Sequence, residues 1–580
     1  MTAEKKKFNI SKQSLVFAVM FAASLVFMLW KLPYGFGGSD EAFYLTVPHR
    51  LCLGDELFFD EWHLSQLSSF FTLPFVWLYR LVNGSNDGII LAARGVYVLV
   101  HSAAALVLYL RLKKFGAASI PAAIIFMLFT PFDMMCCSYN TIAVDTLVLA
   151  GAFACTADEN ARISHAVSGA LFACTVVCCP YFASAYLLYF IAVLICAPLR
   201  KSGRIKGESG IFTWRRFGLF TCGILLIFAL FIFFFFRHSG IHQLVSALPG
   251  LFTDPEHPSY SFWFMLKHYV YCLVTVHRLM PVLLAVFAVL IIAAAADKKR
   301  SMRAALYFVP TALCTLLCWA LFLDGLSENN YNAIMFPLVP LGFMAYILLE
   351  KKPRALFWSG YVLGVLYSFC VSASSNMGFL VLSMALAVAD VPSIIFIGLL
   401  ARQTRAGDRK KSVPVCASAL AAVLCLAALA VTVKATHCFW NGSPAELNSR
   451  IEKGPARGII TSEELSRDYE RVYDDLRYYD ERPRGGLLVY AQETWCWLIL
   501  DDYPYSSFSA WLSGIDETTE QRLALYYEIN PQKYPRYIYI LKDTAFAQTN
   551  IDAKQLYEDA EKHGFSVLEN ELSYKLEKIQ

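Results

Sequence analysis

The sequence predicts a polytopic α-helical membrane protein that ends in a small α/β domain. Of its 580 residues, 57% are hydrophobic and only 17% are charged, and the mean hydropathy is +0.48. Such a composition is too apolar for a water-soluble globule. Apolar runs of membrane-spanning length recur up to about residue 434, and the chain then becomes charged and mixed. These observations together give the fold class.

The first apolar run covers about 14–32 and follows Lys5, Lys6 and Lys7. At about 1.5 Å per helical residue it is long enough to cross the hydrocarbon layer. It is not followed by the small-residue cleavage site of a secretory signal, so we expect an uncleaved span. Its basic flank predicts a cytoplasmic N-terminus.

Twelve further apolar runs bring the predicted number of spans to about thirteen. They cover roughly 88–110, 117–131, 141–157, 164–179, 182–198, 217–236, 281–296, 303–323, 332–349, 355–373, 377–400 and 413–434. With these spans, the clusters of Lys and Arg fall on alternate loops, on the side of the N-terminus. An odd number of spans then puts the remainder of the chain on the opposite, extracytoplasmic face.

Two domains follow from this division: a membrane domain over 1–434, whose first outer loop is about 33–87, and an outer domain over 435–580. Periodicity in the outer domain predicts helices over 461–479 and 494–500 and strands over 486–490 and 537–541. Alternating helices and strands are typical of an α/β domain. This domain contains no Gly-rich phosphate loop, CxxC pair or HExxH motif. We therefore expect the chemistry in the membrane domain.

Ionisable residues near the membrane are few, and in hydrocarbon each costs roughly 2.5–3.5 kcal/mol. By the predicted topology, several lie near the outer surface: Asp40, Glu41, Asp60, Glu61, His63, Arg94, Asp133 and Asp145. A carboxylate there can act as general base toward a hydroxyl group, and a cation can hold a phosphate. Acids and bases at the level of lipid headgroups favour a reaction on a lipid phosphate.

Short motifs in the membrane domain resemble those of the C-type glycosyltransferase superfamily, in particular its protein O-mannosyltransferase and aminoarabinose-transferase (ArnT-like) branch. The matching stretches are Asp40-Glu41, Phe59-Asp60-Glu61-Trp62-His63, Arg94 early in the second span, Asp145 opening the fourth, and Asn330-Tyr331-Asn332 before Pro337. Where that family has a loop lysine, this chain has His63, and Leu64-Ser65 replace the following Pro-Pro.

The resemblance implies a hexosyl- or pentosyltransferase that takes a sugar from a polyprenyl-phosphate donor and passes it, with inversion, to a hydroxyl group. The acceptor would be a lipid, a cell-envelope polysaccharide or a protein. In this interpretation Asp40 is the general base and Glu41 orients it, while Arg94 and His63 hold the donor phosphate. Contacts to acceptor or sugar would come from Asp145, Asp60, Glu61 and Tyr331.

This interpretation also places the protein in the plasma membrane of a bacterium, with membrane lipids and no nucleic acid as partners. No organic cofactor is expected, and a divalent metal bound through Asp60 or Glu61 is left open.

Structural explanations compete for each of these residues. Asp40 and Glu41 could cap a helix N-terminus, as could Asp145. Arg94 could extend its side chain to the headgroups, and His63 could be an ordinary surface residue.

Two other classes of function compete as well. A secondary transporter should carry charges and broken helices near the bilayer midplane, where only Asp390 with Pro392 fits. A non-enzymatic partner in envelope-polymer assembly should be indifferent to the change Asp40→Asn.

Overall fold

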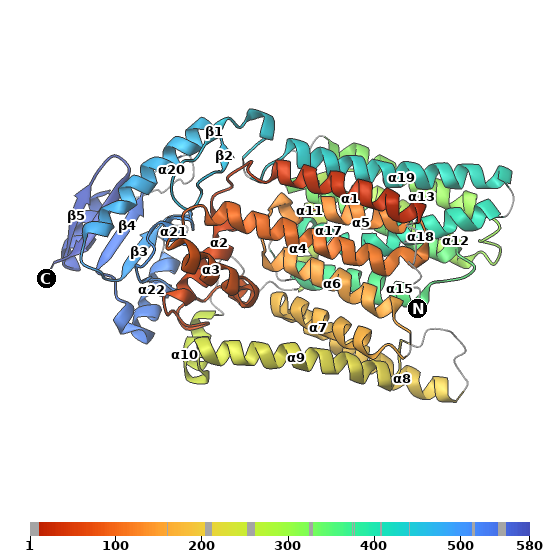
Figure 1. The fold of residues 1–580 in the computed structure, drawn as a ribbon, viewed down its shortest axis with the longest axis horizontal. Coiled ribbons are helices and arrows are strands. Elements are labelled where there is room, and N and C mark those ends of the chain that lie inside the picture. Colours follow the sequence, from red (N-terminus) through yellow and green to blue (C-terminus); the bar gives the residue numbers. More distant parts are fainter. Residues whose placement is uncertain are drawn as a thin grey trace, which may run out of the picture.

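The computed structural model describes residues 11–158, 160–202, 211–251, 262–323, 329–373, 375, 377–406, 409–439, 441–512, 517–542, 544 and 553–579. Figure 1 shows a long bundle of helices with a mixed α/β domain at one end. The last long apolar helix ends at Thr436, and the six strands of the described part all follow it. The predicted fold class is confirmed.

Ten helical runs in the described residues are long and apolar enough to cross a membrane. They are built on α1 (Lys12–Lys31), α4 (Ile89–Leu112), α6 (Tyr139–Thr156), α8 (Ala183–Lys201), α9 (Trp214–His238), α13 (Ala304–Phe322), α14 (Leu338–Leu348) with the preceding turn η6 (Asn329–Met335), α15 and α16 (Arg354–Leu356 and Leu363–Ala373), α18 (Ala387–Ala406) and α19 (Arg409–Thr436).

The remaining predicted spans are helical but differ in length or shape. α11 (Phe262–Val276) and α12 (Met280–Ala296) form a pair bent by 105°, which counts as an eleventh candidate span. α5 (Ser119–Leu128) and α7 (Arg162–Cys178) are apolar but shorter. Ten residues of helix extend only about 15 Å, half the hydrocarbon thickness. The described residues therefore contain ten or eleven full-length candidates instead of thirteen.

The chain forms these helices where local signals agree with the apolar pattern. The side chain of Ser11 accepts a hydrogen bond from the backbone N–H of Ser14 at 3.2 Å and starts α1. Ser138 and Thr141 form a reciprocal capping box at the start of α6. Such caps satisfy N–H groups that a helix start leaves without partners.

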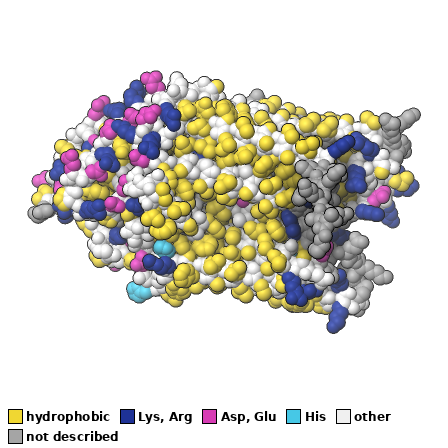
Figure 2. All heavy atoms as spheres, viewed as in Figure 1, with side chains coloured by type: hydrophobic (Ala, Val, Ile, Leu, Met, Phe, Trp, Pro, Cys, Tyr) yellow, Lys and Arg dark blue, Asp and Glu magenta, His cyan; other side chains and the backbone are white. Residues whose placement is uncertain are grey.

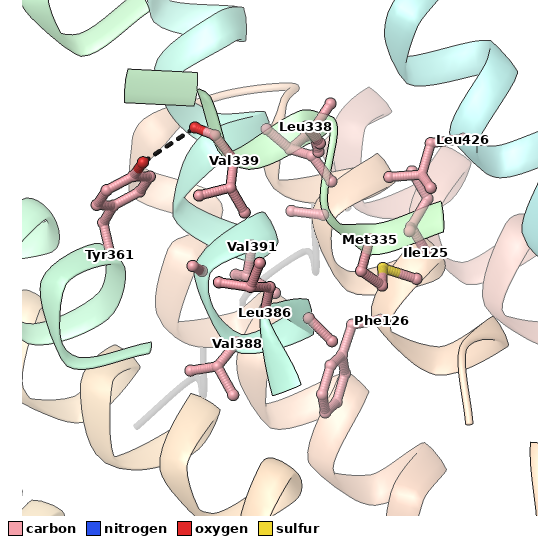
Figure 3. Close-up of a cluster of buried hydrophobic side chains, with 14 of the residues drawn as sticks. Ile125, Phe126, Met335, Leu338, Val339, Tyr361, Leu386, Val388, Val391 and Leu426 are labelled. Carbon is pink, nitrogen blue, oxygen red and sulfur yellow. Dashed lines mark hydrogen bonds between the residues drawn. The ribbon is translucent and has the colours of Figure 1, made fainter. Parts of the chain in front are cut away.

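The core of the bundle lies where α5, α14 and α18 meet, together with α17 (Phe379–Ala385). Figure 3 shows apolar side chains from α5, α14 and α18 in one cluster, with Phe126, Val339 and Val391 among them. The hydroxyl group of Tyr361 donates to the carbonyl of Val339 at 3.0 Å. This hydrogen bond satisfies one buried polar group inside an otherwise apolar core.

The surface has the charge distribution of a membrane protein. In Figure 2, hydrophobic side chains cover the middle of the bundle, while charged side chains gather at its two ends. Lys and Arg dominate the end opposite the α/β domain. An uncharged belt between two charged ends matches a bilayer and its headgroups. The protein is therefore an integral membrane protein.

The C-terminal part contains a four-stranded sheet with strand order β3-β4-β6-β5. β3 and β4 are parallel, with Leu487 opposite Tyr537, and the other two pairings are antiparallel. The elements are β1 (Ser449–Arg450), β2 (Ile460–Thr461), α20 (Glu463–Leu476), β3 (Leu487–Tyr490), α21 (Cys496–Ile499), α22 (Glu517–Ile529), β4 (Tyr537–Leu541), α23 (Ala553–Lys562), β5 (Phe565–Glu569) and β6 (Ser573–Lys578). All four elements predicted here coincide with observed ones.

The loop between α1 and α4 folds with this C-terminal part. It contains α2 (Ser39–Cys52) and α3 (Ser69–Asn83), and α10 (Ile241–Leu251) also lies at this end of the bundle. Phe36 and Phe43 from the loop share one hydrophobic core with Tyr469 and Trp495 from the C-terminal part. This shared core holds the start of α2 at the junction of the two domains.

Candidate active site

Helix α2 begins with the two carboxylates that the sequence predicts to be catalytic. Gly38 precedes it with φ of 74°, a conformation that favours glycine. Asp40 and Glu41 follow in the first helical turn, where the N-terminal dipole favours negative charge. Asp40 is half-buried and Glu41 is buried. The two side chains have different surroundings, and we therefore consider a different role for each.

Asp40 lies among tyrosines from three elements. Its charge acts on Tyr44 of α2, Tyr139 of α6 and Tyr331 of η6. Tyr331, a predicted sugar or acceptor contact, is 1% exposed, and its ring centroid is 4.5 Å from that of His437. The carboxylate of Asp40 and the tyrosine hydroxyl groups are thus polar groups in mainly apolar surroundings.

Glu41 is held by Arg94 of α4. The Nε and Nη2 atoms of Arg94 donate to the two carboxylate oxygens of Glu41, each at 2.6 Å. The remaining N–H groups of Arg94 donate to three backbone carbonyls, those of Leu32 (2.9 Å), Tyr34 (3.2 Å) and Gly35 (2.6 Å). A guanidinium group has five N–H donors, so all of them have protein acceptors.

The phosphate-binding role predicted for Arg94 would therefore require one of these bonds to break. The geometry favours a different role for both residues. Arg94 and Glu41 tie the end of α1, the start of α2 and the outer part of α4 together, and this holds Asp40 in place.

Beside this ion pair lies a buried group of charges, the lysine cluster, formed by Lys31, Asp133, Lys434 and His437. The Nζ atom of Lys31 is 3.4 Å from Asp133 Oδ2, and Lys434 forms an ion pair with Asp133 Oδ1. Lys434 also donates to Thr130 Oγ1 at 2.8 Å. Each member of the cluster is at most 7% exposed.

The lysine cluster holds two ammonium groups against one carboxylate. His437 approaches the same carboxylate oxygen of Asp133 as Lys31 does, with Nδ1 3.8 Å from Oδ2. Lys31 donates to the backbone carbonyl of His437. An uncompensated buried charge is costly. The extra positive charge would be offset by an anion bound next to it.

A small cavity of about 20 Å³, with room for about one water molecule, lies between the lysine cluster and the Glu41–Arg94 ion pair. Lys31 and Asp133 line one part of its wall, and Glu41 and Arg94 another. Backbone of Gly35 and Gly37 completes the lining near α2. The cavity thus joins a cationic wall to the helix turn that carries Asp40.

The backbone that carries Asp133 is strained. Phe132 and Asp133 have φ of 57° and 52°, which L-residues rarely adopt. Each such residue costs on the order of 1–3 kcal/mol. Asn332 accepts a hydrogen bond from the N–H of Phe132 at 3.1 Å and helps to fix the turn. Strain of this kind is common at functional sites, because the surrounding structure maintains a required geometry.

The sequence predicts Asp133 to lie near the outer surface, but Lys31, Lys434 and His437 were not among the predicted site residues. Lys31 and Lys434 lie at the ends of the first and last apolar runs, where a lysine is usually an ordinary residue flanking a membrane span. A signal was present, because the predicted topology puts both on the outer side, where basic residues are depleted.

Asp145 does not line this cavity. It lies in α6 and pairs with His101 of α4, whose Nδ1 is 2.7 Å from Asp145 Oδ1. His101 Nε2 is 3.1 Å from the carbonyl oxygen of Phe126, so Nε2 carries a proton. The two side chains bridge α4, α5 and α6, and an acceptor contact by Asp145 stays a prediction.

Asp60 and Glu61 lie at the junction with the C-terminal domain. Glu61 accepts from Arg50 at 2.9 Å and from the backbone N–H of Ala510 at 3.1 Å. Asp60 accepts from the hydroxyl group of Tyr526 at 3.2 Å. Burial raises the pKa of both carboxyl groups. Through these contacts Asp60 and Glu61 hold the first outer loop against the C-terminal domain. The contacts favour this structural role over contact with a substrate.

His63 is half-buried at the start of a short turn after this pair. Its Nδ1 atom is 2.6 Å from Ser65 Oγ, and its ring meets that of Phe43 on α2 with a centroid separation of 5.1 Å. His63 therefore lies against α2, and its predicted role in phosphate binding stays a prediction. As for metals, the described residues hold no group of three or more His, Cys, Asp or Glu side chains placed to bind an ion.

No protein-family model matches the sequence, and no curated protein matches it either. Among solved structures, the chain is similar to the oligosaccharyltransferase of Archaeoglobus fulgidus in its apo form, with 10% identity over 90% of this chain and 69% of that one and a TM-score of 0.47. It is also similar to ArnT from Cupriavidus metallidurans in the apo state, with 12% identity over 98% and 99% of the two chains and a TM-score of 0.40.

Proposed function

We propose that this protein is an integral-membrane glycosyltransferase that moves a sugar from a polyprenyl-phosphate donor to a hydroxyl acceptor. The observation that carries the proposal is the buried lysine cluster, with two ammonium groups against one carboxylate, beside the small cavity that Lys31, Glu41 and Arg94 line. A cationic pocket suits a phosphate, and a half-buried carboxylate suits a general base. The acceptor would be a lipid, a polysaccharide or a protein.

In the proposed reaction, the carboxylate of Asp40 takes the proton of the acceptor hydroxyl group. The hydroxyl oxygen attacks the anomeric carbon and forms the new glycosidic bond. The bond between that carbon and the phosphate oxygen breaks, and its electron pair stays on the phosphate. Lys31 and Lys434 stabilise the charge that develops there. A single displacement of this kind inverts the anomeric centre.

The remaining residues act by position. Glu41 and Arg94 fix the turn that carries Asp40, and Tyr331, whose ring contacts that of His437 in the lysine cluster, is proposed as a sugar contact. The site would face the extracytoplasmic side, because Lys and Arg gather at the opposite end of the bundle. The C-terminal domain would lie on that same outer side of a bacterial plasma membrane.

The test uses purified full-length protein and a panel of radiolabelled polyprenyl-phosphate sugars, both hexosyl and pentosyl, with hydrolysis or transfer as readout. We expect Asp40→Asn to lower turnover by about 10²–10⁴, the usual contribution of a general base. Lys434→Met should lower it by about 10²–10³, as the loss of an electrostatic stabiliser does. The matched control is Lys453→Met, whose partly exposed lysine pairs with Asp474 on the domain surface.

Two results would contradict the proposal. One is that wild-type protein neither binds nor turns over any donor in the panel. The other is that Asp40→Asn and Lys434→Met turn over donor like Lys453→Met, which would place the catalytic site elsewhere. The first result would favour a partner without enzymatic activity.

A further inference from the structure

The C-terminal domain sends one acidic side chain to the start of α2. Glu493 lies between β3 and α21 and is 4% exposed. The indole Nε1 of Trp495 donates to its Oε2 at 2.9 Å. The same oxygen abuts Gly38, where an added Cβ would lie only 2.4 Å from it. The carboxyl group of Glu493 therefore contacts the residue that precedes the turn carrying Asp40.

The segment around Glu493 is fixed to the membrane domain. The hydroxyl group of Thr46 on α2 donates to the carbonyl of Thr494 at 3.1 Å. Nδ2 of Asn86, just before α4, donates to the carbonyl of Leu498 at 3.0 Å. Trp495 is completely buried in the core that the two domains share. Glu493 is thus held in place from both sides.

The charged group that acts on Glu493 is another carboxylate, that of Asp40. Among the described residues, Glu493 forms no ion pair with a Lys, Arg or His side chain, and the printed hydrogen bond to its carboxyl group comes from Trp495. The titratable groups that act on Glu493 or feel its charge are Asp40 of α2 and Cys496 of α21. Burial and then the charge of Asp40 raise the pKa of Glu493 to about 8. Near pH 7 its carboxyl group is therefore mostly protonated.

We propose that Glu493 is a positioning residue for Asp40, supplied by the C-terminal domain to complete the active site. This inference rests on the proposed function. The neutral carboxyl group lies against Gly38, two residues before Asp40, and adds no negative charge at the start of α2. Ionised, Glu493 would place a second negative charge next to the base and the anionic donor. The domain would then act directly on the reaction.

The pairing itself can be tested without substrate. Infrared titration of the purified full-length protein follows the absorption of protonated carboxyl groups. We expect Glu493→Gln to remove one such group at neutral pH. Asp40→Asn should shift the midpoint of the Glu493 titration to lower pH, because a neighbouring negative charge is lost. The control Glu452→Gln, at an exposed position of the same domain, should change neither.

If no protonated carboxyl group is lost in Glu493→Gln, or if Asp40→Asn leaves the midpoint where it was, the pairing is wrong. The second measurement uses the native Glu493, so it remains decisive even when Glu493→Gln does not fold.

The effect on catalysis appears in the pH profile of turnover. In wild type, kcat should fall about tenfold at one pH unit above the pKa of Glu493, as expected for an essential protonated group. Glu493→Gln keeps a neutral donor of the same size, so its kcat should stay level over that range, with KM little changed. Glu493→Ala should have low kcat throughout. A purely structural role would leave the shape of the profile unchanged in Glu493→Gln and would overturn the proposal.

The two proposals fail in different ways. Absence of turnover with every donor would overturn the proposed reaction, whereas the infrared titration would still decide whether Glu493 and Asp40 are coupled.

Discussion

Lys31 and Lys434 bind the same carboxylate, Asp133, from the ends of the first and the last long helices of the membrane domain. Neither lysine lies near the other in sequence, and both are almost completely buried. The group is stable only while Asp133 is charged and in place. The same pair of lysines therefore determines both the stability of the cluster and its proposed affinity for phosphate.

Replacing Asp133 by Asn should destabilise the protein strongly. Two buried ammonium groups would lose their counter-charge, and removing one partner of a buried ion pair typically costs about 3–5 kcal/mol. The double variant Asp133→Asn with Lys434→Met should recover part of this loss, because fewer charges are left unpaired. Denaturant or thermal unfolding in detergent measures both. Equal stability of the single and double variants would mean that the lysines are not coupled through Asp133.

Arg94→Lys should be poorly tolerated although it conserves the charge. A lysine ammonium group cannot reproduce two parallel bonds to Glu41 together with bonds to three carbonyls. We expect a loss of about 2–4 kcal/mol in stability, within the range for a broken buried network. The matched control is Arg457→Lys, since that arginine is largely exposed and 4.0 Å from Asp87. A wild-type unfolding temperature in Arg94→Lys would contradict the assigned role.

Gly38→Ala should damage the protein in two separable ways. The alanine must adopt φ of 74°, and its Cβ would collide with Glu493. Gly54→Ala is the control for the first effect, since Gly54 has φ of 99° and no atom within 4 Å of the added Cβ. We expect Gly54→Ala to cost about 1–2 kcal/mol and Gly38→Ala distinctly more. Adding Glu493→Ala should relieve only the collision, as unfolding measurements on the double variant would show.

Glu493 also predicts how stability depends on pH. Its pKa is about 8 in the folded protein against an ordinary value of 4.5. Between these two values the folded state binds the proton and the unfolded state releases it, so stability from this group falls as pH rises. The decrease begins above pH 4.5 and levels off above about pH 8. The difference in unfolding free energy between wild type and Glu493→Gln, measured across this range, isolates the effect. A difference independent of pH would contradict it.

Asp390→Leu should stabilise the membrane domain. Asp390 lies in α18, is 2% exposed, and neither of its carboxylate oxygens has a hydrogen-bond partner among the described residues. Replacing an unsatisfied buried polar group by an apolar one of similar size should gain about 1–3 kcal/mol. Thermal unfolding in detergent measures the gain. A stabilised variant that has also lost an ion or proton flux in proteoliposomes would instead favour the transporter alternative.

The helices were predictable because membrane spans need long apolar runs, and each of the thirteen predicted runs coincides with a helix. Their lengths were less predictable. α5 ends at Leu128 although the apolar stretch continues, because Phe129 and Thr130 become extended and lead into the strained turn at Asp133. That turn is fixed by tertiary contacts to Asn332 and Lys434, which no local pattern reveals.

The position of the candidate site could be predicted from the sequence, but the side chains that contact one another within it could not. The acidic pair at Asp40 and Glu41 was located because two adjacent carboxylates beside an apolar run are conspicuous. That Arg94 pairs with Glu41, and that Lys31 and Lys434 both pair with Asp133, depends on which helix ends meet in three dimensions. Glu493 was unpredictable for the same reason, since it is distant in sequence from every other member of the site.

The core shared by Phe36, Phe43, Tyr469 and Trp495 has a consequence for engineering. In sequence, the natural place to cut would be after α19, near Thr436. In space, however, the cooperative unit includes the segment with α2 and α3, which lies between α1 and α4. A chimera that exchanges only the C-terminal region would cut through a single core. To transplant the outer half of this protein, two separate stretches of chain must move together.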